Sequence, residues 1–169
     1  MAARATRGLT SKDDLLPGVQ RAFETIGFAK ASGSANDARS LGFLRDVDRI
    51  TMNRERLIAD AKAAALERVR DGYCRPLPRE IAVGGEGVLA ALKLGVHLGW
   101  RAGRLSAHDA LVGRTLAFIL AGGSLPHQTT VSEQYLLDLE REAMLKLCGE
   151  PNTLARIQYT LKTGKPLRN

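Results

Sequence analysis

Aromatic residues are scarce in this chain of 169 residues, because Phe, Trp and Tyr together make up only 5% of it. Strands are usually rich in aromatic and β-branched residues. Alanine, leucine and glycine supply much of the apolar content here, and alanine and leucine are strong helix formers. The composition therefore predicts an all-α fold in which helices pack on helices.

Cysteine is also rare, and no Cys-x-x-Cys motif accompanies Cys74 and Cys148. Two cysteines are too few for a disulfide framework, and such usage is typical of the reducing cytoplasm. No stretch reaches the roughly 18 apolar residues of a membrane span. The arginines near the N-terminus are not followed by the apolar segment of a secretory signal. We therefore expect a cytoplasmic protein with no membrane span.

Motifs that carry chemistry are missing as well. His97, His108 and His127 form no metal-ligand spacing with one another or with the cysteines. No Gly-x-Ser-x-Gly nucleophile motif occurs. The glycine-rich residues 84–87 precede a predicted helix but lack the full Rossmann or phosphate-loop pattern. The sequence predicts no catalytic residue and no metal site in this chain.

Positive charge is in excess, with 25 Lys and Arg against 18 Asp and Glu, a net charge of +7 at pH 7. Such a charge suits nucleic acid, an anionic membrane or a phosphate-bearing ligand, and it also serves solubility. The basic residues are dispersed, with no run of five or six, so nucleic acid is not the partner we expect. The one local excess lies in residues 151–169, which contain no acid.

Apolar periodicity and capping signals predict six or seven helices. We expect them near residues 14–30, 35–41, 54–70, 86–102, 106–121, 130–148 and 151–163. Ser106 with Asp109 and Thr130 with Glu133 have the spacing of capping boxes. A pair of glycines four residues apart, Gly95 and Gly99, permits a close backbone contact with another helix.

The prolines at 76 and 78 exclude a helix between the two halves of the chain. Residues 71–85 are therefore the predicted linker. This linker divides the chain into a first helical lobe, residues 1–70, and a second helical lobe, residues 86–169.

The C-terminal stretch, residues 129–169, has the clearest local signals. Pro151 suits the first turn of the last helix, and Gly164 suits the position just after its end. Lys162, Lys165 and Arg168 lie near that end and can meet the phosphates of a nucleotide-like ligand. Cations also favour the C-terminal end of any helix, which is the simpler interpretation.

Four stretches resemble the C-terminal part of large bifunctional bacterial β-oxidation proteins, which join a 3-hydroxyacyl-CoA dehydrogenase to a crotonase-type enoyl-CoA hydratase region. They are DLLPGVQRAFETIGFAKASGSANDARSLGFL, ITMNRERLIADAK, LKLGVHLGWRAGRLSAHDALVGRTLAFILAGG and TVSEQYLLDLEREAMLKLCGEPNTLARIQYTLKTGKPLRN. The ending GKPLRN is distinctive, and the resemblance extends over residues 14–169. Within it, residues 1–70 resemble the region that follows the crotonase active site.

The resemblance implies a function in fatty-acid β-oxidation. A helical region of this kind closes the acyl-CoA site and mediates subunit contacts, so its implied partners are upstream crotonase and dehydrogenase domains, acyl-CoA and further copies in a homo-oligomer. Lys162, Lys165 and Arg168 are then candidate contacts to CoA phosphates.

The family uses NAD and coenzyme A, but its NAD-binding glycine fingerprint, oxyanion-hole glycines and catalytic acids have no match in this chain. We therefore expect a C-terminal fragment that is not catalytic alone and binds no cofactor alone. The alternative is a stand-alone basic helical interaction module, with nucleic-acid binding as one use. Steep salt dependence of binding to DNA or RNA would distinguish it.

Overall fold

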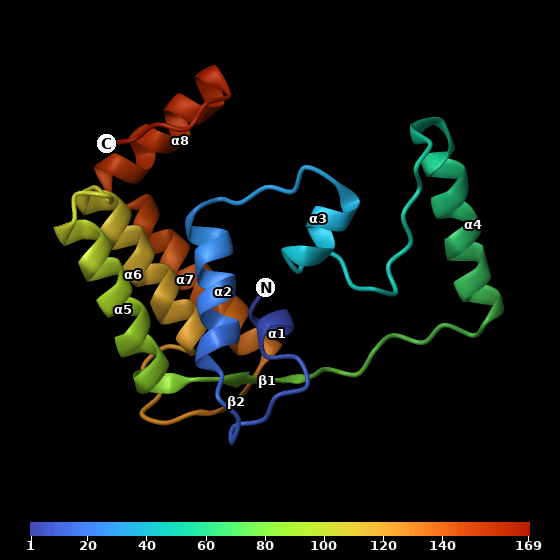
Figure 1. Ribbon diagram of the computed structural model, residues 1–169, viewed down its shortest axis with the longest axis horizontal. Coiled ribbons are helices and arrows are strands. Elements are labelled where there is room, and N and C mark those ends of the chain that lie inside the picture. Colours follow the sequence, from blue (N-terminus) through green and yellow to red (C-terminus); the bar gives the residue numbers. More distant parts are fainter. The chain divides into compact units, whose positions relative to one another are not determined.

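The structure is a computed structural model that describes residues 1–169. It is mostly helical, as Figure 1 shows. The helices are α1 (Ala2–Ala5), α2 (Leu16–Gly27), α3 (Ala35–Ser40), α4 (Leu57–Arg70), α5 (Gly85–Arg101), α6 (Ala107–Ala121), α7 (Glu133–Cys148) and α8 (Pro151–Thr163), with a 3₁₀ turn, η1, at Arg54–Arg56. The helical fold class is confirmed, but two short strands, β1 (Glu80–Val83) and β2 (Thr129–Ser132), were not predicted. None of the helices combines the length and the apolar character that crossing a membrane requires.

The chain divides into two compact units. The first unit comprises Met1–Lys30 and Arg79–Asn169, and the second comprises Ala31–Pro78. This division differs from the predicted lobes, 1–70 and 86–169, because α1 and α2 pack with elements that follow residue 79. Part of the predicted linker, 71–85, is a strand of the first unit.

The two strands of the first unit form an antiparallel pair in which Val83 lies opposite Thr129. Short β-branched runs suit strands, and β1 buries three successive residues from Ile81 to Val83. Thr130 lies within β2, where its hydroxyl donates to Glu80 Oε2 at 2.6 Å. The predicted N-cap at Thr130 is therefore wrong, and Ser132 caps α7 instead, because its Oγ accepts from the backbone N–H of Tyr135, the third residue of the helix.

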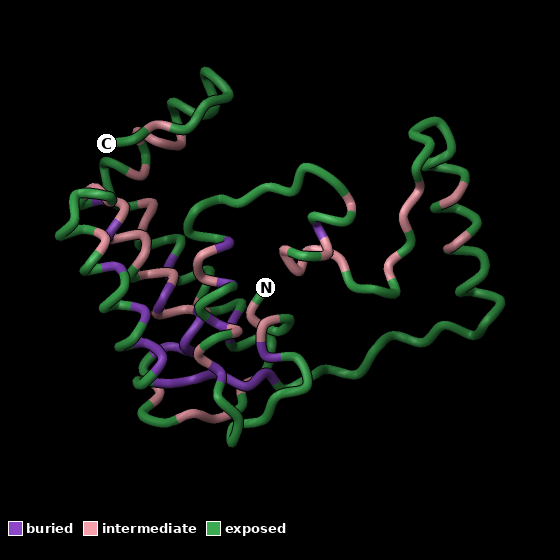
Figure 2. The backbone as a smooth tube through the Cα atoms, viewed as in Figure 1, coloured by how far each residue is buried: buried purple, intermediate pink, exposed green.

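The core of the first unit lies between α2, α5 and α6, beside β1, as the buried positions in Figure 2 show. Burial of apolar side chains is the main favourable term in folding. The buried cluster consists of Leu15, Val19, Ala82, Val88, Leu89, Leu92, Ala117, Leu120 and Ala121.

Gly113 permits the close approach of α5 and α6. A Cβ atom added to Gly113 would lie 3.1 Å from Val96 Cγ2 on α5. Gly95, which would permit such a contact, has open space around it and makes none. Gly99 is close to a neighbour, but the neighbour is Leu105 in the loop after α5.

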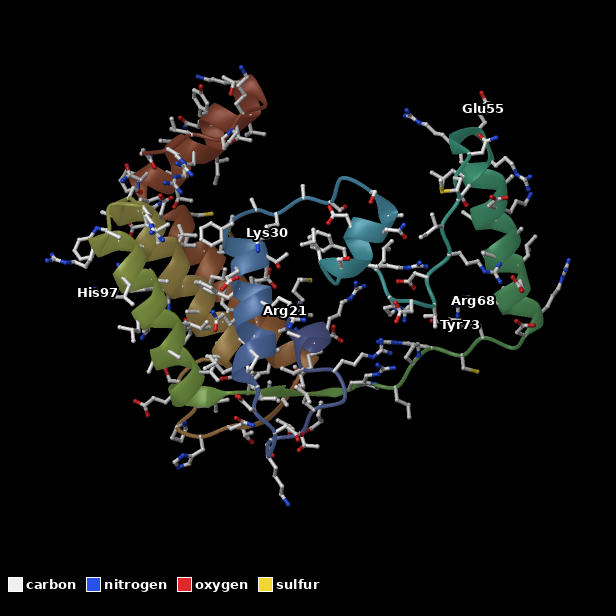
Figure 3. The ribbon with its side chains drawn as sticks, in the orientation of Figure 1. Arg21, Lys30, Glu55, Arg68, Tyr73 and His97 are labelled. Carbon is white, nitrogen blue, oxygen red and sulfur yellow. The ribbon has the colours of Figure 1, made fainter.

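The second unit is held mainly by polar contacts. Arg49 Nη2 lies 2.6 Å from Glu67 Oε2 on α4. Arg39 Nη2 donates to the carbonyl oxygen of Asp48 at 2.9 Å. The guanidinium of Arg68 lies 6.0 Å from the centre of the Tyr73 ring, and both residues are labelled in Figure 3. No residue of α4 is buried.

Candidate functional site

The C-terminal pair of helices, α7 and α8, has the clearest local signals in the sequence. The first of them, α7, packs within the first unit. Leu136 and Ala143 are buried there. The Tyr135 hydroxyl donates to the carbonyl oxygen of Gly122 at 3.1 Å. The exposed face of α7 carries two ion pairs at helical spacing, Arg141–Asp138 at 3.7 Å and Lys146–Glu142 at 2.7 Å.

The second helix, α8, begins and ends as predicted. Pro151 occupies its first turn, and Gly164 ends it in the left-handed conformation at φ 68°. None of its residues is fully buried, and polar contacts join it to α6. One of these joins Thr153 Oγ1 to Nε2 of the buried His108 on α6, at 3.0 Å.

Arg156 is the main link between α8 and the rest of the first unit. Its Nη2 lies 2.8 Å from Asp109 Oδ1 on α6. Its Nε donates to Asn169 Oδ1 at 2.7 Å, and the Asn169 side-chain amide donates to the carbonyl oxygen of Asn152 at 3.1 Å. We call Asp109, Arg156 and Asn169 the Arg156 clamp.

Asp109 serves two elements at once. Its Oδ2 accepts from the Ser106 backbone N–H at 3.0 Å, while Ser106 Oγ accepts from the Asp109 backbone N–H, so the predicted capping box of α6 is confirmed. Burial raises the pKa of Asp109, but the hydrogen bonds from Ser106 and Arg156 and the charge of Arg156 outweigh it. The pKa of Asp109 therefore lies below its ordinary value of 3.8.

The basic tail folds back along α8. The Thr160 hydroxyl donates to the carbonyl oxygen of Lys165 at 3.2 Å, which holds Lys165 beside the last turns of the helix. Arg168 directly precedes Asn169, which is bonded near the start of α8. Asn152 and Thr160 are about 12 Å apart along the helix axis, at about 1.5 Å per residue. Lys162 and Lys165 therefore share one end of α8, and the backbone of Arg168 lies toward the other.

All three of these basic side chains are exposed, and none takes part in an ion pair. The C-terminal end of a helix carries partial negative charge, which favours a nearby cation such as Lys162. Exposed, unpaired ammonium groups can receive an anion without first breaking an internal contact.

The histidines and cysteines were the other candidate site residues. No group of three or more His, Cys, Asp or Glu side chains could hold a metal ion. His97 lies on the outer side of α5, with its ring 5.9 Å from that of Trp100 (Figure 3). Both cysteines are free. Of the three histidines, His108 contacts the Thr153 hydroxyl described above.

The glycine-rich turn at residues 84–87 is filled by the chain itself. The Glu86 backbone N–H donates to the carbonyl oxygen of Leu125 at 2.9 Å. A Cβ atom on Gly85 would lie 2.6 Å from the carbonyl oxygen of His127. Carbonyl oxygens therefore occupy the space that a bound phosphate would need, and the turn is an ordinary helix start.

The Arg156 clamp is the feature that sequence reasoning missed. Asp109 was recognised only as a capping residue, and Arg156 only as one of several cations in the tail. A basic residue in a segment without acids must find any acidic partner elsewhere in the chain, but the sequence does not identify that partner.

Comparison with known proteins gives one informative match. The chain is 42% identical, over 156 residues, to a probable 3-hydroxyacyl-CoA dehydrogenase of Bacillus subtilis (strain 168). The match includes 92% of this chain but only 20% of that protein, so the chain spans about a fifth of the relative's length. No protein-family model matches the chain, and no solved structure matches it.

This match supports the dehydrogenase part of the predicted resemblance. The crotonase part of the resemblance, and the CoA contacts derived from it, remain predictions. The relative is about five times as long as the aligned region, so its activity does not follow for this chain from similarity alone.

Proposed function

We propose that this chain is a helical, non-catalytic component of fatty-acid β-oxidation that works together with 3-hydroxyacyl-CoA dehydrogenase and crotonase-type hydratase domains. Its role is to close the acyl-CoA site and to mediate subunit contacts. The observation that carries the proposal is the 42% identity to the dehydrogenase over 92% of this chain.

Exposed apolar side chains on α4 support the subunit contacts. The notable residues are Leu57, Ile58, Leu66 and Val69, and Ile58 is 83% exposed. Together with Ala61 and Ala65 they form one side of the helix, which we call the α4 face. Large exposed apolar patches mark interaction surfaces. We propose that the α4 face packs on the crotonase-type domain.

Lys162 and Lys165 are the proposed contacts to the phosphates of CoA, with Arg168 as a weaker third contact. A titration of CoA, dephospho-CoA and pantetheine into the chain tests this role. We expect affinity to fall in that order, because phosphate groups are removed in that order. Equal affinity for CoA and pantetheine would remove the phosphate role.

A double variant, Lys162→Ala with Lys165→Ala, should weaken CoA binding about tenfold or more, whereas Arg168→Ala should change it less. Arg79→Ala is a matched control, since it removes an exposed cation just before β1, which lies away from α8 in Figure 1. If the control weakens binding as much as the double variant, only the net charge matters. Strong, steeply salt-dependent binding of unrelated DNA would favour the interaction-module alternative.

A further inference from the structure

The outward side of α5 is apolar and has no partner within the first unit. Leu94 and Leu98 are 57% and 58% exposed there. Gly87 and Ala91 are exposed one and two turns earlier on the same side of the helix. An added Cβ atom at Gly87, or at Gly95 on the flank, would meet no atom within 4 Å. We call Gly87, Ala91, Leu94 and Leu98 the α5 face.

The inward side of α5 is apolar as well. It buries Val88, Leu92 and Val96, and the helix packs on α2 and α6. A helix that is largely apolar on both sides is normally covered on both sides. Figure 1 places α5 at one edge of the first unit, where no other element of that unit covers the α5 face. The cover must therefore come from outside the first unit.

The size of the side chains changes along the α5 face. Gly87 and Ala91, in its first half, are small, whereas Leu94 and Leu98, in its second half, are large. The four positions are separated by four, three and four residues, which is the spacing of a coiled-coil seam. When two copies of α5 run antiparallel with Ala91 opposite Leu94, the same register places Gly87 opposite Leu98. Each leucine then meets a small residue, so the α5 face complements itself.

The charges beside the α5 face also match in this arrangement. Glu86 at the start of α5 and Arg101 at its end have no ion-pair partner within the chain. They lie on the same flank, and a two-fold axis brings like flanks of the two helices together. The register places Glu86 about 3 Å along the axis from Arg101 of the second copy. Opposite charges therefore meet at both ends of the seam.

We propose that the α5 face binds the α5 face of a second copy of this chain, antiparallel about a two-fold axis. Burial of Leu94 and Leu98 favours the pair, and the small residues opposite them let the two backbones approach closely. The seam from Gly87 to Leu98 is about 17 Å long, at about 1.5 Å per residue. This is short for a stable interface, so we expect a weak dimer with a Kd above about 10 µM.

Disulfide trapping tests the register. Cys74 and Cys148 are first replaced by alanine, and Gly87→Cys and Leu98→Cys are then made as separate variants. Residue 87 of one copy lies opposite residue 98 of the other, whereas two like residues are about 16 Å apart along the helix, beyond the reach of a disulfide. After oxidation in air, a mixture of the variants should cross-link and each variant alone should not. Equal cross-linking of the single variants, or none in the mixture, would overturn the proposal.

Sedimentation velocity over a concentration series measures the strength of the pair. Ile58→Gln and Val69→Gln are present throughout, so that the α4 face does not contribute. Leu94→Gln should raise the Kd at least tenfold, because a symmetric dimer loses two leucines from its seam. Leu137→Gln is the matched control, since it changes a leucine on α7 that is 50% exposed, and it should leave the Kd unchanged. An equal rise in both variants would overturn the proposal.

Charge variants test the orientation of the two helices. Glu86→Gln and Arg101→Gln should each raise the Kd about threefold, and the two together no further, because both remove the same ion pair. Lys93→Gln also removes one cation from α5, but Lys93 lies near the two-fold axis beside its own copy, so this variant should lower the Kd. Additive rises, or a rise in Lys93→Gln, would overturn the antiparallel arrangement.

A CoA titration keeps this outcome separate from that of the proposed function. The α5 face contains neither Lys162 nor Lys165 and no residue of the α4 face. Leu94→Gln should therefore bind CoA as the unmodified chain does, while the Lys162→Ala, Lys165→Ala variant should keep the Kd of the dimer. A dimer lost in that double variant would assign the association to the tail and overturn the proposal.

Discussion

The two units of this chain are stabilised by different interactions. Every buried apolar residue except Ala38 belongs to the first unit. The second unit depends on exposed contacts such as the Arg49–Glu67 ion pair. An exposed ion pair contributes about 0–1 kcal/mol, whereas burying one large apolar side chain contributes about 1.5–3 kcal/mol. The first unit therefore carries most of the stability of the chain.

The difference shows that a sequence pattern which predicts a helix does not also predict that the helix is buried. The pattern at α4 predicts a helix as clearly as the pattern at α6 does. Yet α6 contributes Ala117 and Leu120 to the core, while α4 buries nothing. An isolated helix of this length is marginal in water, so α4 needs a partner surface for its stability.

The largest expected effect comes from the core of the first unit. Leu120→Ala should lower the free energy of unfolding by about 2–5 kcal/mol, because Leu120 is only 5% exposed and its loss leaves a cavity. Ile58→Ala on α4 should change it by less than about 0.5 kcal/mol. Urea unfolding followed by the fluorescence of Trp100, which lies in α5, measures the first value.

Amide hydrogen exchange provides the second readout, since it reports both units in one experiment. The amides of α5 and α6 should exchange slowly and those of α4 rapidly. Equal protection in α4 and α6 would contradict the contrast between the units.

A glycine pair gives the next effect. Gly122 has φ 91°, and an added Cβ would lie 2.7 Å from Val83 Cγ2, so Gly122→Ala combines backbone strain with a clash and should cost about 2–4 kcal/mol. Gly42, in the second unit, has φ 77° and open space around it, so Gly42→Ala should cost about 1 kcal/mol locally. Thermal unfolding of the two variants measures both losses of stability, and a larger loss in Gly42→Ala than in Gly122→Ala would contradict the prediction.

The local features of the fold were predictable from sequence. Helix starts at Ser106 and Pro151 and the helix end at Gly164 follow from the bonding needs of the residues themselves. Ion pairs on α7 follow from helical spacing. Such features depend on residues within one turn of each other, so one sequence contains the whole signal.

Features that join distant segments were not predictable. Pairing of β1 with β2 brings together residues about fifty positions apart, and four-residue strands give little periodic signal. The spacing of Thr130 to Glu133 fits a helix cap, but Thr130 is part of β2 and its hydroxyl donates to Glu80 of β1. The Arg156 clamp likewise depends on the packing of α8 near α6. The proposed CoA contacts come from the family resemblance and not from residue spacing.

Self-association through the α4 face is the third prediction. Because this face is exposed, the chain on its own should form oligomers at high concentration. The double variant Ile58→Gln with Val69→Gln should weaken this association about tenfold, since it removes apolar area from the contact. Arg70→Gln, on the other side of α4, should not. Light scattering over a concentration series measures it, and a strict monomer would contradict the prediction.

The smallest expected effect on the free energy of unfolding comes from the Arg156 clamp, in which the Arg156–Asp109 ion pair joins α8 to α6 within the first unit. The Arg156 and Asp109 side chains are only 24% and 26% exposed, against 77% and 54% for Arg141 and Asp138. Less solvent screens the first pair, so Arg156→Gln should cost about 1 kcal/mol at pH 7. Arg141→Gln, the exposed control, should cost no more than a few tenths of that.

The pH dependence of this difference follows from the lowered pKa of Asp109. A carboxyl group whose pKa is lower in the folded state binds a proton less readily there than in the unfolded state. Its contribution is complete above the ordinary value of 3.8 and is lost as the pH falls through the folded-state pKa. The gap between the parent chain and Arg156→Gln should therefore be constant near neutral pH and shrink below about pH 4. Urea unfolding at neutral pH and below about pH 4 measures this difference in unfolding free energy. A difference that persists at the acid pH would assign the role of Arg156 to its bonds with Asn169 alone.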